Sequence, residues 1–165
     1  PIFARDILHV GPQGFGLLRA AFGVGALLMA VYLSRRPIVR HGGRWMFAAV
    51  ALFGLCTLTF GLSKSVWLSG LVLFIGGAAD MASAAFRQSI LLAAATDEVR
   101  GRLQGVFIVV VAGGPRIADV AHGTAAASIG VAATTAFGGI GVIVFTIIAA
   151  LMVPAFIRYR VWQRD

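Results

Sequence analysis

Five long apolar runs divide this sequence, and three of them carry a charge within the run. A run of about 18 or more apolar residues is long enough to cross a bilayer as a helix. A charge inside such a run costs roughly 2.5–3.5 kcal/mol on insertion scales, so it usually faces protein or a water-filled cavity. The pattern predicts an all-α, multi-pass transmembrane bundle in which three helices line a wet interior and two face lipid. The charged runs are 15–33, 66–86 and 103–121, and the uncharged runs are 45–62 and 131–157.

The composition excludes an ordinary soluble domain. The chain is 59% hydrophobic and only 12% charged, whereas a soluble domain carries about 25% charged residues. The single cysteine, Cys56, falls inside a predicted span, so no disulfide framework is expected. The chain opens on Pro1, and residues 1–14 read as a loop because Pro12 and neighbouring polar residues interrupt any helix. We therefore expect further membrane-spanning sequence upstream of this loop.

The basic residues predict the orientation in the membrane. The net charge is +8, and 10 of the 14 lysines and arginines lie in segments 34–44, 87–102 and 158–165. If all five runs span, these segments share one side, and the other side holds only Arg5 and Lys64. Cytoplasmic loops collect Lys and Arg. The bias predicts an outer N-terminal loop and a cytoplasmic C-terminal tail, and it explains the positive charge without a nucleic-acid partner.

Four charged residues inside the runs are the candidates for substrate binding or ion coupling: Arg19, Asp80, Arg116 and Asp119. Arg116 and Asp119, three residues apart, can pair on one helix face. Asp80 has a structural alternative, which is an ion pair with Arg87 or with a loop arginine. Arg19 could instead extend its guanidinium to the outer surface. At 1.5 Å per residue, Asp80 and Arg116 differ in depth by about 13 Å, which excludes a direct salt bridge.

A helix kink is predicted at Gly113, Gly114 and Pro115, because proline lacks a backbone donor and clashes with the preceding turn. Segment 87–102 reads as a long loop with a short stretch along the cytoplasmic face, and Thr96-Asp97 resembles a helix start.

The sequence contains none of the usual catalytic patterns. No Cys/His cluster has zinc-ligand spacing, and the Gly-Gly pairs lack the following Gly-Lys-Ser/Thr of a phosphate-binding loop. His9, His41 and His122 all lie in predicted loops or at span ends, away from a serine nucleophile. We therefore expect no enzymatic activity, no metal and no cofactor.

Several of these residues also form family-like motifs. The motifs are Asp80, Arg87-Gln88, Asp97-Glu98-Val99-Arg100-Gly101-Arg102, Gly113-Gly114-Pro115-Arg116 and Asp119. Together they resemble the C-terminal half of a major facilitator superfamily transporter, closest to the branch that contains the enterobactin exporter. Arg40-His41-Gly42-Gly43-Arg44 resembles the cytoplasmic loop between helices 8 and 9 of that superfamily, but without its acidic residue. The resemblance covers essentially the whole chain.

The resemblance implies that residues 1–165 are a partial C-terminal transmembrane domain containing helices 8–12 of a twelve-helix transporter. In the superfamily, helices 9 and 12 face lipid, helix 10 lines the cavity, and helices 8 and 11 meet the other half. Helices 9 and 12 correspond to the two uncharged runs, and helices 8, 10 and 11 correspond to the three charged runs. The implied cytoplasmic gating residues are Arg35, Arg36, Arg40, Arg44, Arg87, Arg100 and Arg102.

The implied function is secondary active efflux by alternating access, coupled to proton antiport, in a bacterial inner membrane. The exported compound would be a small organic molecule, drug-like or a siderophore. The implied partners are membrane lipid, the N-terminal half of the same chain and the small-molecule substrate. Two alternatives stay open: a multi-pass scaffold or assembly protein that does not transport, and a small channel assembled from several copies with the charged helices lining a pore.

Overall fold

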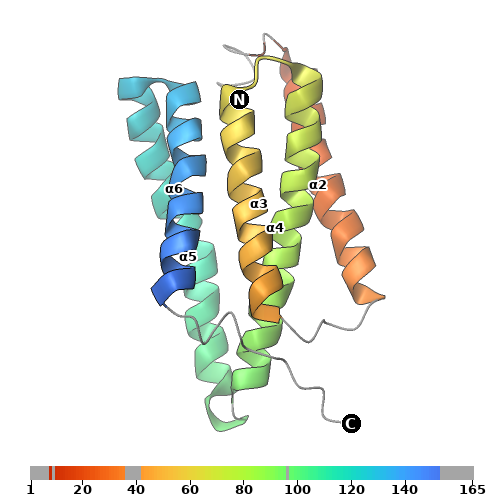
Figure 1. Cartoon of the computed structure of the whole chain (residues 1–165), viewed down its shortest axis with the longest axis vertical. Coiled ribbons are helices and arrows are strands. Elements are labelled where there is room, and N and C mark those ends of the chain that lie inside the picture. The colour runs from red at the N-terminus through yellow and green to blue at the C-terminus, as the bar shows by residue number, and fades with distance from the viewer. Residues whose placement is uncertain (1–7, 9, 36–41, 96, 153–165) are drawn as a thin grey trace.

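The computed structural model describes residues 8, 10–35, 42–95 and 97–152. Within those residues the fold is all-α, as predicted, and the helices run up and down beside one another (Figure 1). In this described part of the chain, five helices are long and apolar enough to cross a membrane. They are α2 (Pro12–Ser34), α3 (Gly42–Leu62), α4 (Val66–Ala94), α5 (Asp97–Ile129) and α6 (Val131–Met152).

Helices α4 and α5 are longer than the apolar runs that predict them, and they correct the expected loop at 87–102. Leu91 to Ala94 continue α4, since Leu and Ala are strong helix formers, and α5 begins at Asp97. A helical hairpin therefore replaces the loop and its short cytoplasmic stretch, and it extends beyond the other helices in Figure 1. The side-chain amide of Gln88 donates to Oε1 of Gln104 over 3.2 Å and joins its two arms.

The other predicted spans correspond closely to helices. Residues 15–33 and 45–62 lie within α2 and α3. Helix α2 begins at Pro12, inside the loop expected over 1–14, because proline suits the first turn of a helix, where no backbone donor is needed. The last predicted span, 131–157, begins with α6, and its residues 153–157 lie outside the described part of the chain, as do residues 1–7 of the N-terminal loop. Successive helices run in opposite directions (Figure 1), so Lys64 lies at one end of the bundle and a group of arginines lies at the other. These arginines are Arg35, Arg44, Arg87, Arg100 and Arg102.

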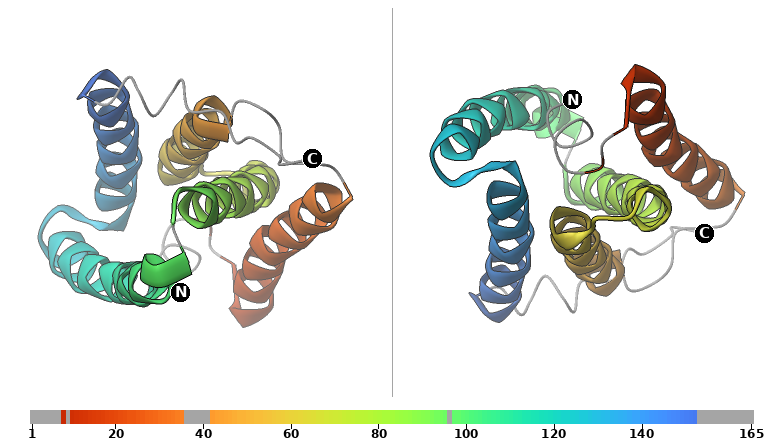
Figure 2. Two further views of the ribbon diagram at one scale, coloured as in Figure 1. Left: turned by 90° about the horizontal axis from the view of Figure 1, so that it is seen from below. Right: turned by 90° about the horizontal axis from the view of Figure 1, so that it is seen from above.

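The helices are sorted by charge across the bundle. Helix α4 packs against both α2 and α3, α6 packs against α3, and α5 packs against α6. Seen along the bundle, α3 and α6, which contain the two uncharged apolar runs, lie together on one side, and α2 and α5 border the other side with α4 between them (Figure 2). That the second group lines a water-filled interior and the first faces lipid stays a prediction.

Glycines bring the α2–α4 pair into close contact. A Cβ atom at Gly25 would overlap the carbonyl oxygen of Phe74, and one at Gly77 would overlap the carbonyl oxygen of Phe22. The two glycines thus hold reciprocal places at one helix crossing. In lipid, where no hydrophobic effect drives helices together, small residues allow the close backbone approach that stabilises such a pair.

Glycines also allow close contact between α3 and α6. A Cβ at Gly139 would lie 2.5 Å from the backbone nitrogen of Leu58, and one at Gly61 would lie 2.7 Å from that of Ala136. Helices α2, α3 and α4 also share an apolar cluster at the arginine-rich end, built around buried Met46, Phe86 and Ile90. These contacts make α2, α3, α4 and α6 a continuous packed unit.

The two turns at the end opposite the arginines are built differently. Between α3 and α4, the fully buried Ser69 donates its hydroxyl to Oγ of Ser63 over 3.1 Å, and the Ser63 hydroxyl donates to the carbonyl oxygen of Ser65. Between α5 and α6 stands one residue, Gly130, with φ +87°. That left-handed conformation suits glycine because it has no Cβ. It reverses the chain sharply and sets α6 beside α5.

Candidate functional site

Three of the four candidate charges are exposed on the surface of the helices. Arg19 on α2 and Arg116 and Asp119 on α5 are all exposed, and Asp80 on α4 is half-buried. Helix α5 has no buried residue in its most apolar membrane-length window. Arg19 therefore lies on a helix that packs against α4, and Arg116 and Asp119 lie on α5, which packs against α6. Figure 2 shows α2 and α5 bordering the same side of the bundle.

Asp80 lies beside the tightest part of the bundle. Gly76, Gly77 and Ala79 around it are buried, and the Ser83 hydroxyl donates to the backbone carbonyl of Asp80 over 2.8 Å. Among the described residues, no salt bridge connects Asp80 with Arg87, one of its expected structural partners, or with Arg116. The intervening stretch of α4 contributes Ala82 and Phe86 to the apolar cluster instead.

Helix α5 carries the Gly-Gly-Pro segment without interruption. Pro115 lies inside a helix that is continuous from Asp97 to Ile129, so the chain is not broken there. The helix follows a curved path in Figure 2, and a sharp kink at Pro115 stays a prediction. Arg116 and Asp119 follow directly, and in this part of the structure no salt bridge joins them.

The arginines predicted to gate the cytoplasmic side gather at one end of the bundle. Arg35, Arg44, Arg87, Arg100 and Arg102 are exposed at the ends of α2, α3, α4 and α5. Two more, Arg36 and Arg40, lie outside the described residues. Three of these arginines lie on the α4–α5 hairpin, whose two arms are joined by the Gln88–Gln104 hydrogen bond.

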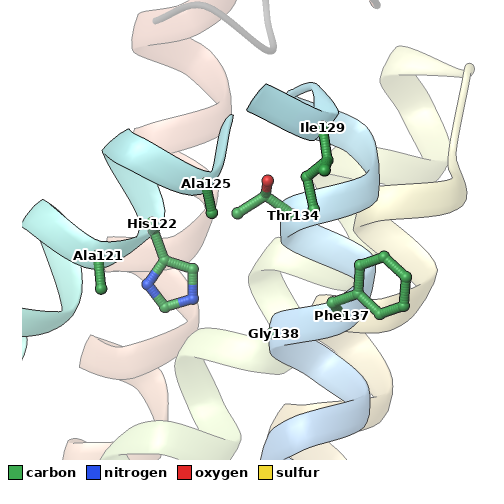
Figure 3. A pocket seen from close by; sticks show the side chains of 7 residues that line it. All are labelled: Ala121, His122, Ala125, Ile129, Thr134, Phe137 and Gly138. Carbon is green, nitrogen blue, oxygen red and sulfur yellow. The ribbon is translucent and has the colours of Figure 1, made fainter. Parts of the chain in front are cut away.

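A crevice between α5 and α6 was not foreseen from the sequence. It has a volume of about 280 Å³ and lies at the end of the bundle opposite the arginines (Figure 3). Its walls are mostly apolar, with His122 as the one ionisable group: Ala125 and Ile129 come from α5, and Phe137 and Gly138 from α6. The sequence signal for His122 was weak, because a lone histidine at a span end reads as an interfacial residue. No cluster of metal-binding side chains is found among the described residues.

The sequence matches one known protein family, and the helical fold agrees with that match. A family model described as transmembrane secretion effector, a branch of the major facilitator superfamily, matches residues 1–161. No curated protein and no solved structure matches the chain. The match covers nearly the whole sequence, the helices are those of a multi-pass membrane protein, and the chain thus belongs to the transmembrane secretion effector family of major facilitator transporters.

Proposed function

We propose that this chain is the C-terminal half of a secondary active efflux transporter in a bacterial inner membrane, with α2 to α6 as helices 8–12. The transporter exports a small organic compound, drug-like or a siderophore, by alternating access and in exchange for protons. The C-terminal tail is cytoplasmic, and the N-terminal half of the same chain is the principal partner. We place its function with that of the enterobactin exporter branch.

The observation that supports this proposal is the exposure of charge on membrane-spanning helices. Arg19, Arg116 and Asp119 are exposed on α2 and α5, within apolar segments long enough to span the membrane. Ionised side chains in lipid are costly, so such groups normally face protein or water. A second bundle that covers the α2–α5 side and leaves a wet cavity between the halves satisfies this requirement. Rocking of two such halves around a central site is the general mechanism of transporters built from repeats.

Asp80 and Arg116 lie at different depths in the membrane, and we assign them different roles. Asp80 serves inward gating and stability near the arginine-rich end, where salt bridges of the loop arginines form and break. Arg116, closer to the outer end and next to Asp119, contacts an anionic group of the substrate, because a desolvated guanidinium binds carboxylate strongly and bidentately.

Export by the full-length protein tests this assignment. Everted vesicles with an imposed pH gradient would be loaded with labelled anionic and cationic drug-like compounds and with a catecholate siderophore. We expect Arg116→Ala to lower transport of the anionic compounds about tenfold or more and to spare the cationic ones, since one charge-assisted contact is worth roughly 1.5–3 kcal/mol. Asp80→Asn should slow transport of every compound.

Lys64→Ala is the matched control, because it also removes one positive charge but from the exposed turn between α3 and α4. Protein amount in the vesicles is measured for each variant. Normal transport of anions by Arg116→Ala would reject the substrate role of Arg116. Absence of any gradient-driven transport by the wild type would favour the scaffold reading over the transporter.

A further inference from the structure

His122 presents a lone pair to the crevice between α5 and α6. Its Nδ1 atom lies 2.7 Å from the carbonyl oxygen of Ala118 on the preceding turn. A carbonyl oxygen only accepts hydrogen bonds, so Nδ1 carries a proton, and in the corresponding neutral tautomer Nε2 is an acceptor. Nε2 points toward α6, where a Cβ added at Gly138 would lie 3.2 Å from it (Figure 3).

The rest of the crevice offers no competing partner for that lone pair. The hydroxyl of Thr134 is the other polar side-chain group in the lining, and its proton is donated to the carbonyl oxygen of Gly130 over 2.8 Å. Ala125, Ile129 and Phe137 supply apolar surface. The crevice therefore combines the Nε2 acceptor of His122 with an aromatic and aliphatic wall.

We propose that this crevice is a binding site for a small amphipathic molecule whose apolar body rests on Phe137 and Ile129 and whose single O–H or N–H group donates to Nε2 of His122. Drug-sized ligands occupy pockets of about 300–1,000 Å³. A volume of about 280 Å³ suits a body of one or two rings. The site is separate from Arg116 and Asp80, and it does not depend on the direction or coupling of transport.

The absence of a side chain at position 138 is central to the proposal. Gly138 leaves open the space immediately next to Nε2, which is the space that a donor group of the ligand would occupy. A methyl group there would crowd the imidazole and remove that space. Gly138→Ala therefore tests the site without changing any polar atom.

The experiment compares two probes with the same naphthalene ring system, one with a hydroxyl donor and one without. 2-Naphthol carries a hydroxyl donor, and 2-methoxynaphthalene replaces that proton with a methyl group. Binding to the full-length protein in nanodiscs is measured by equilibrium dialysis, with empty nanodiscs subtracted for partition into lipid. We expect the wild type to bind 2-naphthol roughly three- to tenfold more tightly than its methyl ether, the equivalent of one hydrogen bond.

Two variants test whether the preference for 2-naphthol arises in this crevice, and a third is a control on α5 outside the crevice. His122→Phe keeps an aromatic ring but removes the acceptor, so both probes should bind equally. Gly138→Ala should weaken both probes. Thr124→Val removes a hydroxyl on α5 that bonds only to its own helix backbone and lies outside the crevice lining, so it should leave both affinities unchanged. Size-exclusion profiles confirm that each variant is folded.

Equal binding of the two probes to the wild type would overturn the proposal, and that is the result expected if a lipid acyl chain fills the crevice. A preference for 2-naphthol that survives in His122→Phe would overturn it as well, because the acceptor would then lie elsewhere. Undetectable binding of both probes above empty nanodiscs would also reject the site.

Discussion

Gly25 and Gly23 lie two residues apart on α2, yet a methyl group would meet very different surroundings at the two positions. At Gly25 it would overlap the Phe74 carbonyl of α4, whereas nothing lies within 4 Å of it at Gly23. We expect Gly25→Ala to destabilise the protein by about 1–3 kcal/mol, as overpacking does. Gly23→Ala should be neutral or slightly stabilising, since alanine favours helix.

Thermal unfolding of the two variants in the same detergent measures this difference. The expected order of melting temperature is Gly23→Ala at or above the wild type and Gly25→Ala below it. Equal melting temperatures would mean that α2 and α4 are not held at the distance that the structure gives them.

The serine turn between α3 and α4 makes a second prediction at this scale. Ser63→Ala would leave the buried Ser69 hydroxyl without its acceptor and should cost about 1–3 kcal/mol, more than the roughly 0.5–1.5 kcal/mol expected for Ser69→Ala. Ser128→Ala is the control, because Ser128 is exposed and bonds only within α5. Chemical or thermal unfolding would detect the order; a reversed order would show that Ser63 is satisfied by other groups.

At the scale of elements, we predict that Pro115 bends α5. Pro115→Ala restores a backbone donor and removes the clash with the preceding turn, so we expect a straighter and more stable helix. Spin labels at Gln104 and Ser128, on either side of Pro115, would report this as a longer and narrower distance distribution. Unchanged distances would assign the curvature of α5 to its packing on α6.

The helices themselves could be predicted from sequence, because a long apolar run has few alternatives to a spanning helix. Their pairing could not. Which glycine meets which carbonyl, as Gly77 meets Phe22, depends on helices far apart in the chain. The long hairpin was missed because the arginines of 87–102 read as a loop, although its leucines and alanines favour helix. The His122 crevice was missed because its partner Gly138 lies on another helix and carries no side-chain signal.

For the whole molecule, successive helices run in opposite directions, so the orientation in the membrane can be tested from either side. In a background with Cys56 replaced by alanine, we expect Ser65→Cys to react with an impermeant thiol reagent from outside intact cells. Gln163→Cys, in the tail beyond the described residues, should react only in everted vesicles. The reason is the collection of basic residues at one end, which favours the cytoplasmic side. Reaction of the two positions from the opposite sides would invert the orientation.

The contact between α3 and α6 also has a consequence for how the protein is made. The ribosome completes α3 before α6, with α4 and α5 synthesised in between. The glycine surface of α3 that receives α6, at Gly54 and Gly61, must therefore wait in the lipid without its partner. During that interval it is a target for chaperones, for wrong helices and for quality-control proteases. A ribosome that pauses after α5 would prolong this exposure. Larger residues at Gly54 or Gly61 would hinder the packing of α6 when it arrives, so they should reduce the amount of protein that reaches the membrane intact.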